Sequence, residues 1–277
     1  MRERITYIES DCNRVEYRQK ALCLLLLAFL LSSTPSAIYS KTPKPQAKPV
    51  RVLFVGNSYT SVNKLPLVVM ALAQAKDIDL ACNMSVAGGA TLENHLKGEK
   101  ELNTLEMIKS GKYNTIVLQD QSLRPIKSPK LTIKDIGQFC ESINESEITP
   151  YLFMTWAREG NPQTQELLKK TFEQASKQYG AKVVPVGMAW QRALKQKSDI
   201  ELYDEDGSHP SELGTYLSAC VFFSALTGES PKGLAKEIRI TDETGKTVFL
   251  LKISKQNAEF CQQVAEQTMK EFTSEQK

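Results

Sequence analysis

A short apolar run near the start of the chain ends abruptly in turn residues, and this pattern limits the folds that the chain can adopt. Val52–Val55 (Val-Leu-Phe-Val) is followed at once by Gly56, Asn57 and Ser58. An apolar run of this length, ended by turn residues, is typical of a strand buried on both faces, as in a parallel sheet. Leu65–Ala75 beyond the turn is apolar enough to form a helix. The sequence therefore predicts strand, turn and helix, with Ser58 at the carboxyl end of a central strand.

The alternation of strand and helix continues along the chain. Helix-like stretches separate the apolar runs, and we expect one continuous helix over Leu92–Ile108. Such alternation predicts a parallel sheet covered by helices on both faces, that is, a three-layer α/β/α fold with a flavodoxin-like sheet. The further strands are expected at 78–86, 113–118, 150–155 and 182–186.

The amino-terminal segment differs in composition from the rest of the chain. A polar, basic stretch precedes the apolar run Ala21–Leu31, which has the length of a signal-peptide core and is short for a membrane span. We expect residues 1–40 to direct export to the periplasm or the exterior of a bacterium; an uncleaved membrane anchor is the alternative. Residues 41–49 are a proline-rich linker. Residues 50–235 would form the main domain, and residues 236–277 a hairpin and helix packed on it.

Charge and cysteine content exclude several classes of protein. The formal net charge of +3 is small and dispersed, so we expect no nucleic-acid partner. Cys82, Cys140, Cys220 and Cys261 are widely spaced and contain no Cys-x-x-Cys pair, which disfavours a zinc site. They are expected as small buried side chains, although an exported protein could pair them in disulfides. No spacing suggests a metal or an organic cofactor.

Residues suited to acyl transfer follow the predicted strands. Ser58 follows the first strand, Gly89 the second and Gln121 the third, and a late loop carries Asp206 and His209. Because the carboxyl ends of parallel strands meet at one edge of a sheet, we expect these residues to converge there. A serine, a glycine amide, a side-chain amide and an Asp/His pair at one edge predict an acyl-transfer site.

Each of these residues has a chemical role and a structural alternative. A serine hydroxyl becomes nucleophilic when an imidazole takes its proton, so His209 is the expected base and Asp206 its orienting partner. The backbone N–H groups of Ser58 and Gly89 and the amide of Gln121 would bind the oxyanion. Alternatively, Ser58 caps the next helix, Gly89 only makes a turn, and His209 is a loop residue without a role. The combination and its order along the chain favour catalysis.

The same residues resemble a known family. Gly-Asn-Ser at 56–58 resembles the first block of the SGNH, or GDSL-type, hydrolases, with asparagine where aspartate is more usual. Ala-Gly-Gly at 87–89 resembles the second block, whose glycine donates to the oxyanion; Gly89 matches best and Gly88 is the alternative. Asp-Gly-Ser-His at 206–209 matches the last block. The resemblance covers most of the main domain and implies a serine hydrolase.

The third block departs from the family pattern. Gly-x-Asn-Asp is usual, whereas residues 118–122 read Leu-Gln-Asp-Gln-Ser. Alignment of the strand ends places Gln121 where the oxyanion asparagine belongs, with Gln119 as the alternative. Leu-Gln-x-x-Ser, together with Thr-Trp-Ala-Arg at 155–158 and Pro-Val-Gly-x-Ala-Trp at 185–190, is similar to a bacterial branch of exported esterases.

Four residues near this edge are candidates for substrate binding: Asn57, Gln119, Trp156 and Arg158. An aromatic face beside a guanidinium would suit a sugar or a carboxylated substrate. Alternatively, Trp156 covers the edge of the sheet, and Arg158 pairs with Glu159 or another acid.

Other notable side chains are expected in structural roles. His95, the only other histidine, is expected as a partly buried polar residue, with a place in the pocket as the alternative. Trp190 is expected as part of the core. Asp204 and Glu205 are expected as solvated loop acids, although either could replace Asp206 as the partner of the imidazole.

We therefore expect an exported serine esterase that hydrolyses a carboxylic ester through an acyl-enzyme. The resemblance implies small acyl groups, and export makes acetylated carbohydrate the leading substrate class. A lipase or thioesterase for longer acyl chains is one alternative, and a non-catalytic carbohydrate-binding module on the same fold is another. A nucleotide-binding domain is disfavoured because the glycines lack the Gly-x-Gly-x-x-Gly and Walker spacings.

Overall fold

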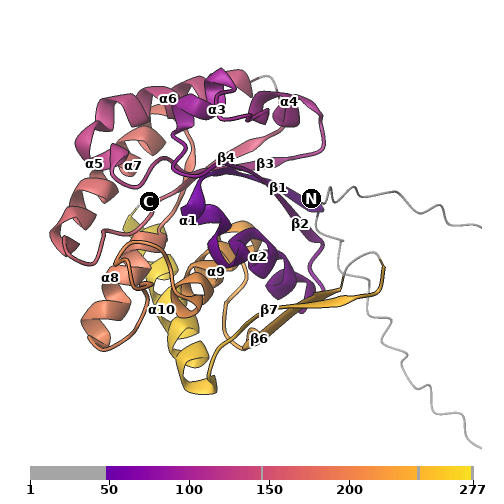
Figure 1. Cartoon of the computed structure of the whole chain (residues 1–277), viewed down its shortest axis with the longest axis vertical. Helices are drawn as coiled ribbons and strands as arrows, with labels where there is room; N and C mark the ends of the chain where they lie inside the picture. Colours follow the sequence, from indigo (N-terminus) through magenta and orange to yellow (C-terminus); the bar gives the residue numbers. More distant parts are fainter. Residues whose placement is uncertain (1–47, 145, 242–243, 276–277) are drawn as a thin grey trace, which may run out of the picture. The chain divides into compact units, whose positions relative to one another are not determined.

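Five parallel strands form the central sheet of the computed structural model, in the order β2-β1-β3-β4-β5. The predicted apolar run is β1, which lies inside the sheet between β2 and β3. Helices cover both faces (Figure 1), so the predicted three-layer α/β/α fold is confirmed. The strands span Val50–Gly56 (β1), Leu80–Val86 (β2), Thr115–Leu118 (β3), Thr149–Phe153 (β4) and Lys182–Val184 (β5).

The side chains of β1 alternate between two hydrophobic cores, one on each face of the sheet. Val52 and Phe54 are fully buried in the core under α2, α8, α9 and α10, whereas Leu53 and Val55 are fully buried under α3, α4, α6 and α7. Successive side chains of a strand point to opposite faces, so one strand supports both helical layers. The helices span Leu65–Gln74 (α2), Leu92–Lys97 (α3), Thr104–Lys109 (α4), Pro129–Ser142 (α6), Gln165–Tyr179 (α7), Val186–Gln196 (α8), Glu212–Thr227 (α9) and Lys255–Glu275 (α10).

The structure describes residues 48–144, 146–241 and 244–275. The predicted signal segment and nearly all of the predicted linker lie outside these residues. Lys48–Lys277 form one compact unit. Within the described residues, no helix combines the length and the apolar character needed to cross a membrane.

The segment expected as one helix over Leu92–Ile108 is two short helices, α3 and α4. Gly98 ends α3 with φ of +67°, a left-handed conformation that glycine adopts without steric cost. Lys100 and Glu101 also have positive φ and turn the chain before α4 begins. The apolar spacing alone did not reveal this break. Four short elements were also not predicted: α1 (Ser58–Ser61), α5 (Arg124–Lys127) and the 3₁₀ turns Val62–Lys64 and Pro162–Thr164.

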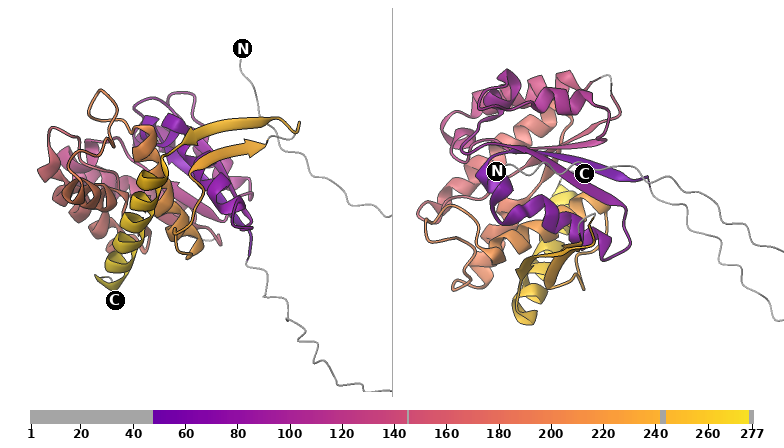
Figure 2. Two further views of the ribbon diagram at one scale, coloured as in Figure 1. Left: turned by 90° about the horizontal axis from the view of Figure 1, so that it is seen from below. Right: turned by 45° about the vertical axis from the view of Figure 1, so that its right-hand side comes forward.

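The carboxyl-terminal part adds a hairpin and a long helix to the layer that contains α9. β6 (Glu237–Thr241) and β7 (Thr247–Lys252) pair in antiparallel orientation. Figure 2 shows the hairpin extending outwards from this layer. Cys261, Val264 and Ala265 of α10 are completely buried against the core, so α10 belongs to the same hydrophobic layer.

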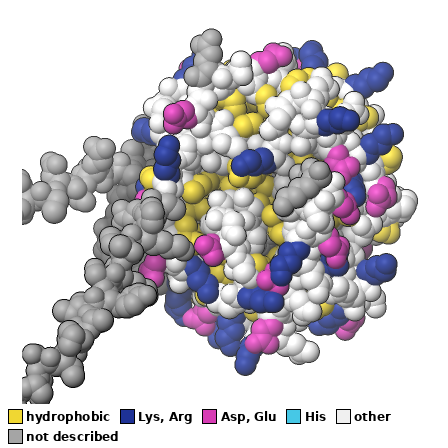
Figure 3. Space-filling view, turned by 180° about the vertical axis from the view of Figure 1, so that it is seen from behind, with side chains coloured by type: hydrophobic (Ala, Val, Ile, Leu, Met, Phe, Trp, Pro, Cys, Tyr) yellow, Lys and Arg dark blue, Asp and Glu magenta, His cyan; other side chains and the backbone are white. Residues whose placement is uncertain are grey.

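The described residues on the face of the protein shown in Figure 3 carry no large field of one charge. On the face shown in Figure 3, Lys and Arg side chains are interspersed with Asp and Glu side chains. The large hydrophobic side chains exposed in the described residues are Leu131, Leu167 and Phe249, which lie on three different elements.

Candidate active site

Ser58 lies in the sharp turn between β1 and α2. β1 ends at Gly56, and Asn57 caps the short helix α1, whose first residue is Ser58. The Asn57 side chain accepts a hydrogen bond from the Tyr59 N–H at 3.1 Å. Gly56 is required here because a Cβ would overlap the side chain of Gln119. The turn therefore presents Ser58 at the carboxyl edge of the sheet, as predicted.

Asp206 and His209 lie in a tight loop before α9. Asp206 Oδ1 accepts hydrogen bonds from the N–H of Ser208 at 2.9 Å and the N–H of His209 at 2.8 Å. The Asp204 N–H donates to the His209 carbonyl at 2.8 Å, and Gly207 adopts a left-handed φ of +62°. This folding of the loop holds the carboxylate beside the imidazole of its own loop.

Ser58, His209 and Asp206 form one chain of hydrogen bonds. Ser58 Oγ lies 2.8 Å from His209 Nε2, and His209 Nδ1 lies 2.5 Å from Asp206 Oδ2. Hydrogen bonds from the His209 ring and backbone lower the pKa of the Asp206 carboxyl to about 2, so it is ionised at neutral pH. The side chains of His209 and Asp206 are 33% and 50% exposed, so this chain opens to solvent.

The glycine loop lies beside the serine turn. Asn57 Nδ2 donates to the Ala90 carbonyl at 2.9 Å, and the Ala90 N–H closes a turn onto the Ala87 carbonyl at 3.1 Å. Gly89 is exposed in this turn with φ of +60°. Across residues 48–144, 146–241 and 244–275, the N–H groups of Ser58 and Gly89 have no hydrogen-bond acceptor. Both donors are therefore available to a ligand.

The structure separates the two candidate glutamines. Gln119 is fully buried: its Oε1 accepts from the Asn57 N–H at 2.9 Å, and its Nε2 donates to the Asp120 carbonyl. Gln119 therefore supports the serine turn, which corrects its expected roles as an alternative oxyanion donor and as a substrate-binding residue. Gln121 Oε1 accepts from the two N–H groups that open α5, and its Nε2 has no partner in the described part of the chain. Gln121 thus keeps a free donor.

Trp156 and Asn57 were expected as substrate-binding residues, and the structure corrects both. Trp156 is 2% exposed and stacks between Tyr59 and Trp190, with ring centroids 4.8 Å and 3.9 Å away. Its Nε1 donates to the Ser208 carbonyl at 3.0 Å. Asn57 is also buried, and both side-chain polar atoms are hydrogen-bonded within the protein. Neither side chain is accessible to a substrate.

The aromatic stack supports the loop that carries His209. Tyr59 packs edge-on against His209, with ring centroids 5.4 Å apart, and its hydroxyl lies 2.6 Å from Ser208 Oγ. Trp190 is almost completely buried, as expected, and Tyr203 packs against its ring at 72°. Sequence reasoning missed Tyr59, although its position directly after Ser58 was a usable signal.

Arg158 reaches across the carboxyl edge towards the loop after β3. The side chain is half-buried, and its Nη2 donates to Ser122 Oγ at 3.0 Å. Glu159, the expected alternative partner, forms no ion pair with it. Asp204 and Glu205, the alternative acids for His209, are exposed and bond only within their own loop.

His95 is buried and uses both ring nitrogens within the protein. Nε2 lies 2.9 Å from the Gly56 carbonyl, which only accepts, so Nε2 carries the proton. Nδ1 accepts from the Thr104 hydroxyl at 2.7 Å, which in turn lies 2.8 Å from Ser85 Oγ. Burial lowers the pKa of His95 and favours the neutral ring. The expected structural role is confirmed: His95 holds the end of β1.

A buried group of charged side chains, the Asp120 cluster (Asp120, Arg124 and Asp135), joins the loops behind the site. Asp120 Oδ1 accepts from the Leu92 N–H at 3.0 Å and the Gln121 N–H at 2.9 Å. Arg124 Nη1 lies 3.2 Å from Asp120 Oδ2 and 2.5 Å from Asp135 Oδ2. The cluster therefore ties the start of α3, after the glycine loop, to the loop that carries Gln121. No spacing in the sequence pointed to it.

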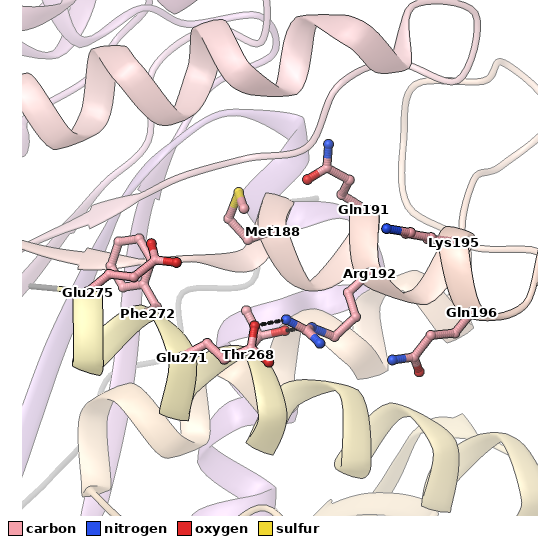
Figure 4. A pocket seen from close by; sticks show the side chains of 9 residues that line it. All are labelled: Met188, Gln191, Arg192, Lys195, Gln196, Thr268, Glu271, Phe272 and Glu275. Carbon is pink, nitrogen blue, oxygen red and sulfur yellow. Dashed lines mark hydrogen bonds and ion pairs between the residues drawn. The ribbon is translucent and has the colours of Figure 1, made fainter.

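The cleft shown in Figure 4 lies apart from these residues. It has a volume of about 590 Å³ between α8 and α10, and Arg192 there donates to Thr268 Oγ1 at 3.2 Å and pairs with Glu271. None of the candidate site residues lines it. Among the described residues, no three His, Cys, Asp or Glu side chains are grouped to hold a metal ion.

Solved structures share this fold at low sequence identity. A DUF4886 family protein from Bacteroides uniformis matches with a TM-score of 0.64 and 21% identity, over 80% of this chain and 95% of that chain. A protein described as "a putative SGNH hydrolase from Slackia heliotrinireducens" matches with a TM-score of 0.53 and 24% identity, over 64% and 98%. An acetyl xylan esterase, AlAXEase, matches with a TM-score of 0.53 and 10% identity, over 64% and 100%.

These likenesses give the chain the fold of the SGNH hydrolases. The resemblance first found in the serine, glycine and histidine blocks is therefore confirmed at the level of the fold. The chain matches no known family profile and no curated protein sequence.

Proposed function

We propose that this protein is a serine esterase that hydrolyses a carboxylic ester through an acyl-enzyme on Ser58. The observation that carries the proposal is the continuous hydrogen-bond chain from Ser58 Oγ through His209 to Asp206, with heavy-atom distances of 2.8 Å and 2.5 Å. A hydroxyl, an imidazole and a carboxylate in this order are the parts that nucleophilic acyl transfer requires.

In the proposed mechanism His209 acts first as a base and then as an acid. Its Nε2 takes the Ser58 proton as Oγ bonds to the ester carbonyl carbon, and then gives that proton to the departing alcohol oxygen. Asp206 holds the Nδ1–H and stabilises the imidazolium. Water then attacks the acyl-enzyme with His209 again as the base, which releases the acid and restores the Ser58 hydroxyl.

The oxyanion of each tetrahedral intermediate would be bound by three donors. The N–H groups of Ser58 and Gly89 are free, and Gln121 Nε2 is the side-chain donor without a partner among the described residues. Loss of one such donor typically slows an enzyme by about 100- to 1,000-fold. Gln121 thus takes the place that asparagine holds in the family pattern.

The surroundings of Ser58 favour a small acyl group, and acetylated carbohydrate is our leading substrate class. The large exposed hydrophobic side chains of the described residues lie on α6, α7 and β7, and none of them lies on the loops that carry Ser58 and His209. A long acyl chain would need an apolar groove at those loops. One protein of the same fold is an acetyl xylan esterase.

We also propose that the enzyme acts outside the cytoplasm. The proposal rests on the amino-terminal signal-like segment, in which a basic stretch precedes an apolar run of the length of a signal-peptide core. Amino-terminal sequencing of the protein recovered from the periplasm and medium would test it. Recovery of an uncleaved chain in the membrane fraction would instead favour the anchor.

Turnover of 4-nitrophenyl esters from acetyl to dodecanoyl tests the proposed activity. Wild type should hydrolyse the acetyl ester best, and Ser58→Ala and His209→Ala should each lower kcat by about ten-thousand-fold or more. Ser142→Ala, which removes an exposed serine at the end of α6, is the matched control and should leave kcat unchanged.

Two outcomes would redirect the proposal. A preference for the dodecanoyl ester would support the lipase or thioesterase alternative. Absence of turnover on every ester, combined with failure of a fluorophosphonate to label Ser58, would contradict the esterase and leave the carbohydrate-binding module.

A further inference from the structure

Arg158 differs from the other arginines of the described residues in having no carboxylate partner. Each of the others forms an ion pair within 4.0 Å, whereas no Asp or Glu side chain of the described residues lies that close to Arg158. Among the described residues, the one hydrogen bond of the Arg158 side chain is the Nη2 contact to Ser122 Oγ, and its Nε is buried without an acceptor. The other arginines are Arg51, Arg124, Arg192 and Arg239.

The uncompensated charge of the Arg158 guanidinium is costly to bury. A guanidinium stays charged at every pH relevant to a protein. A half-buried charge is normally stabilised by an opposite charge or by hydrogen bonds to its donors. Arg124 shows that arrangement in this same chain, with Asp120 and Asp135 both paired to it. Arg158 lacks it, so Nη1 and the remaining hydrogen of Nη2, at the tip of the guanidinium, are suited to an anion that comes with a ligand.

The position of Arg158 is fixed relative to the His209 loop. On one side, Trp156 Nε1 donates to the Ser208 carbonyl at 3.0 Å. On the other, the Glu159 N–H donates to the Gly207 carbonyl at 3.0 Å. The backbone of Arg158 is therefore clamped against the loop between Asp206 and His209. Its guanidinium extends from there to Ser122, the residue after Gln121.

The position of Arg158 indicates that it would contact the alcohol portion of the ester. In the proposed mechanism His209 gives its proton to the departing alcohol oxygen, so the alcohol portion lies on the His209 side of Ser58. The neighbours of Arg158 in the chain, Trp156 and Glu159, are hydrogen-bonded to the His209 loop, and we therefore place Arg158 on that side. A planar guanidinium with free donors binds a carboxylate through two parallel hydrogen bonds.

We propose that Arg158 binds a carboxylate on the alcohol portion of the substrate, so that the preferred substrates are esters of sugar acids. This inference rests on the proposed esterase function and narrows its substrate class. Arg158 is the one of the four expected substrate-binding residues that the structure leaves free to bind a ligand.

The test compares two acetyl esters that differ in one carboxylate, monoacetylated methyl glucuronoside and monoacetylated methyl glucoside. Wild type should prefer the glucuronoside. Arg158→Gln should lower kcat/KM for the glucuronoside by about 10- to 100-fold, mainly through KM, as expected for loss of charged hydrogen bonds. It should change kcat/KM for the neutral ester less than about threefold, and Arg158→Lys should recover part of the loss.

Arg51→Gln is the matched control because it makes the same change at the amino end of β1, where Arg51 pairs with Asp79 at 2.8 Å. Arg51→Gln should leave kcat/KM unchanged for both esters. Equal losses on both esters in Arg158→Gln would overturn the proposal and assign Arg158 to the oxyanion or to the structure of the loop. Absence of any preference for the glucuronoside in wild type would also overturn it.

A binding measurement separates this inference from the esterase proposal. Saturation-transfer NMR with unesterified methyl glucuronoside requires no turnover. A signal in Ser58→Ala that is lost in the double variant with Arg158→Gln would support the carboxylate site even if no ester were hydrolysed. Absence of a signal in Ser58→Ala would contradict the proposed carboxylate site at Arg158. It would not bear on the proposed esterase function of Ser58, His209 and Asp206.

Discussion

The Asp206–His209 pair and the Asp120 cluster both join acids to a base, in opposite surroundings. The side chains of Asp206 and His209 are 50% and 33% exposed, whereas those of Asp120, Arg124 and Asp135 are 0%, 10% and 5% exposed. The exposed pair is open to solvent and therefore accessible to a ligand. The buried cluster cannot change charge cheaply, but it holds the loops on which the exposed pair depends. In the proposed mechanism, the exposed pair would carry out the chemistry and the buried cluster would position it.

The largest difference between the two regions should be in stability. Asp120→Ala leaves the Leu92 and Gln121 N–H groups without their acceptor and removes one carboxylate from Arg124, so unfolding should become easier by about 3 kcal/mol or more. Asp206→Ala should change the free energy of unfolding by less than about 1 kcal/mol while abolishing most activity. Urea unfolding and turnover measure the two effects. Similar losses of stability in both variants would contradict the view that the buried cluster, and not the exposed pair, stabilises the fold.

The two histidines offer a second contrast, which depends on pH. Burial lowers the pKa of His95 below its usual 6.5, so between the two values the unfolded chain holds a proton that the folded protein lacks. Stability should therefore fall as pH is lowered through this window, by at most about 1.4 kcal/mol per pH unit. His95→Gln should remove this contribution, and His209→Gln should keep it. Urea unfolding from pH ~7 to ~5 tests the prediction; an unchanged slope in His95→Gln would contradict it.

The smallest expected effect concerns the contact between the interior and the His209 loop. Tyr59→Phe keeps the stacking on Trp156 and removes the hydroxyl that lies 2.6 Å from Ser208 Oγ, so stability should fall by about 1 kcal/mol. Activity should fall less than about tenfold, because His209 keeps Asp206. Tyr113→Phe, which removes a hydroxyl that accepts from exposed Asn83, is the control. A loss of activity as large as that of His209→Ala would show that the hydroxyl itself takes part in catalysis.

Much of the fold could be predicted because it depends on local patterns. The run Val52–Val55 specified a doubly buried strand, and the alternation after it specified a parallel sheet. The break between α3 and α4 could not be predicted from apolar spacing, because it depends on the left-handed conformations of Gly98, Lys100 and Glu101. Short elements such as α1 and α5 were missed for a related reason: a single helical turn has no periodicity to detect.

The site could be predicted only in part. The convergence of Ser58, Asp206 and His209 could be predicted because they follow strand ends, or lie in the late loop, and the strand ends meet at one edge. Gln119 and Trp156 were assigned to substrate binding because they occupy the same edge in sequence. Both side chains are buried in the structure. The prediction was wrong because a position at a strand end does not tell which way a side chain points.

The layers of this protein, the position of Ser58 at a strand end and the pairing of Asp206 with His209 could all be predicted from the sequence alone. These follow from backbone sterics, hydrophobic periodicity and the requirement of acyl transfer for particular functional groups. Which side chains are free depends on the tertiary structure: within the described residues, Arg158 and Gln121 keep donors without partners, whereas Asn57, Gln119 and Trp156 use theirs internally. Hydrogen bonds between residues far apart in sequence depend on the packing of several loops at once, and no local pattern encodes that packing.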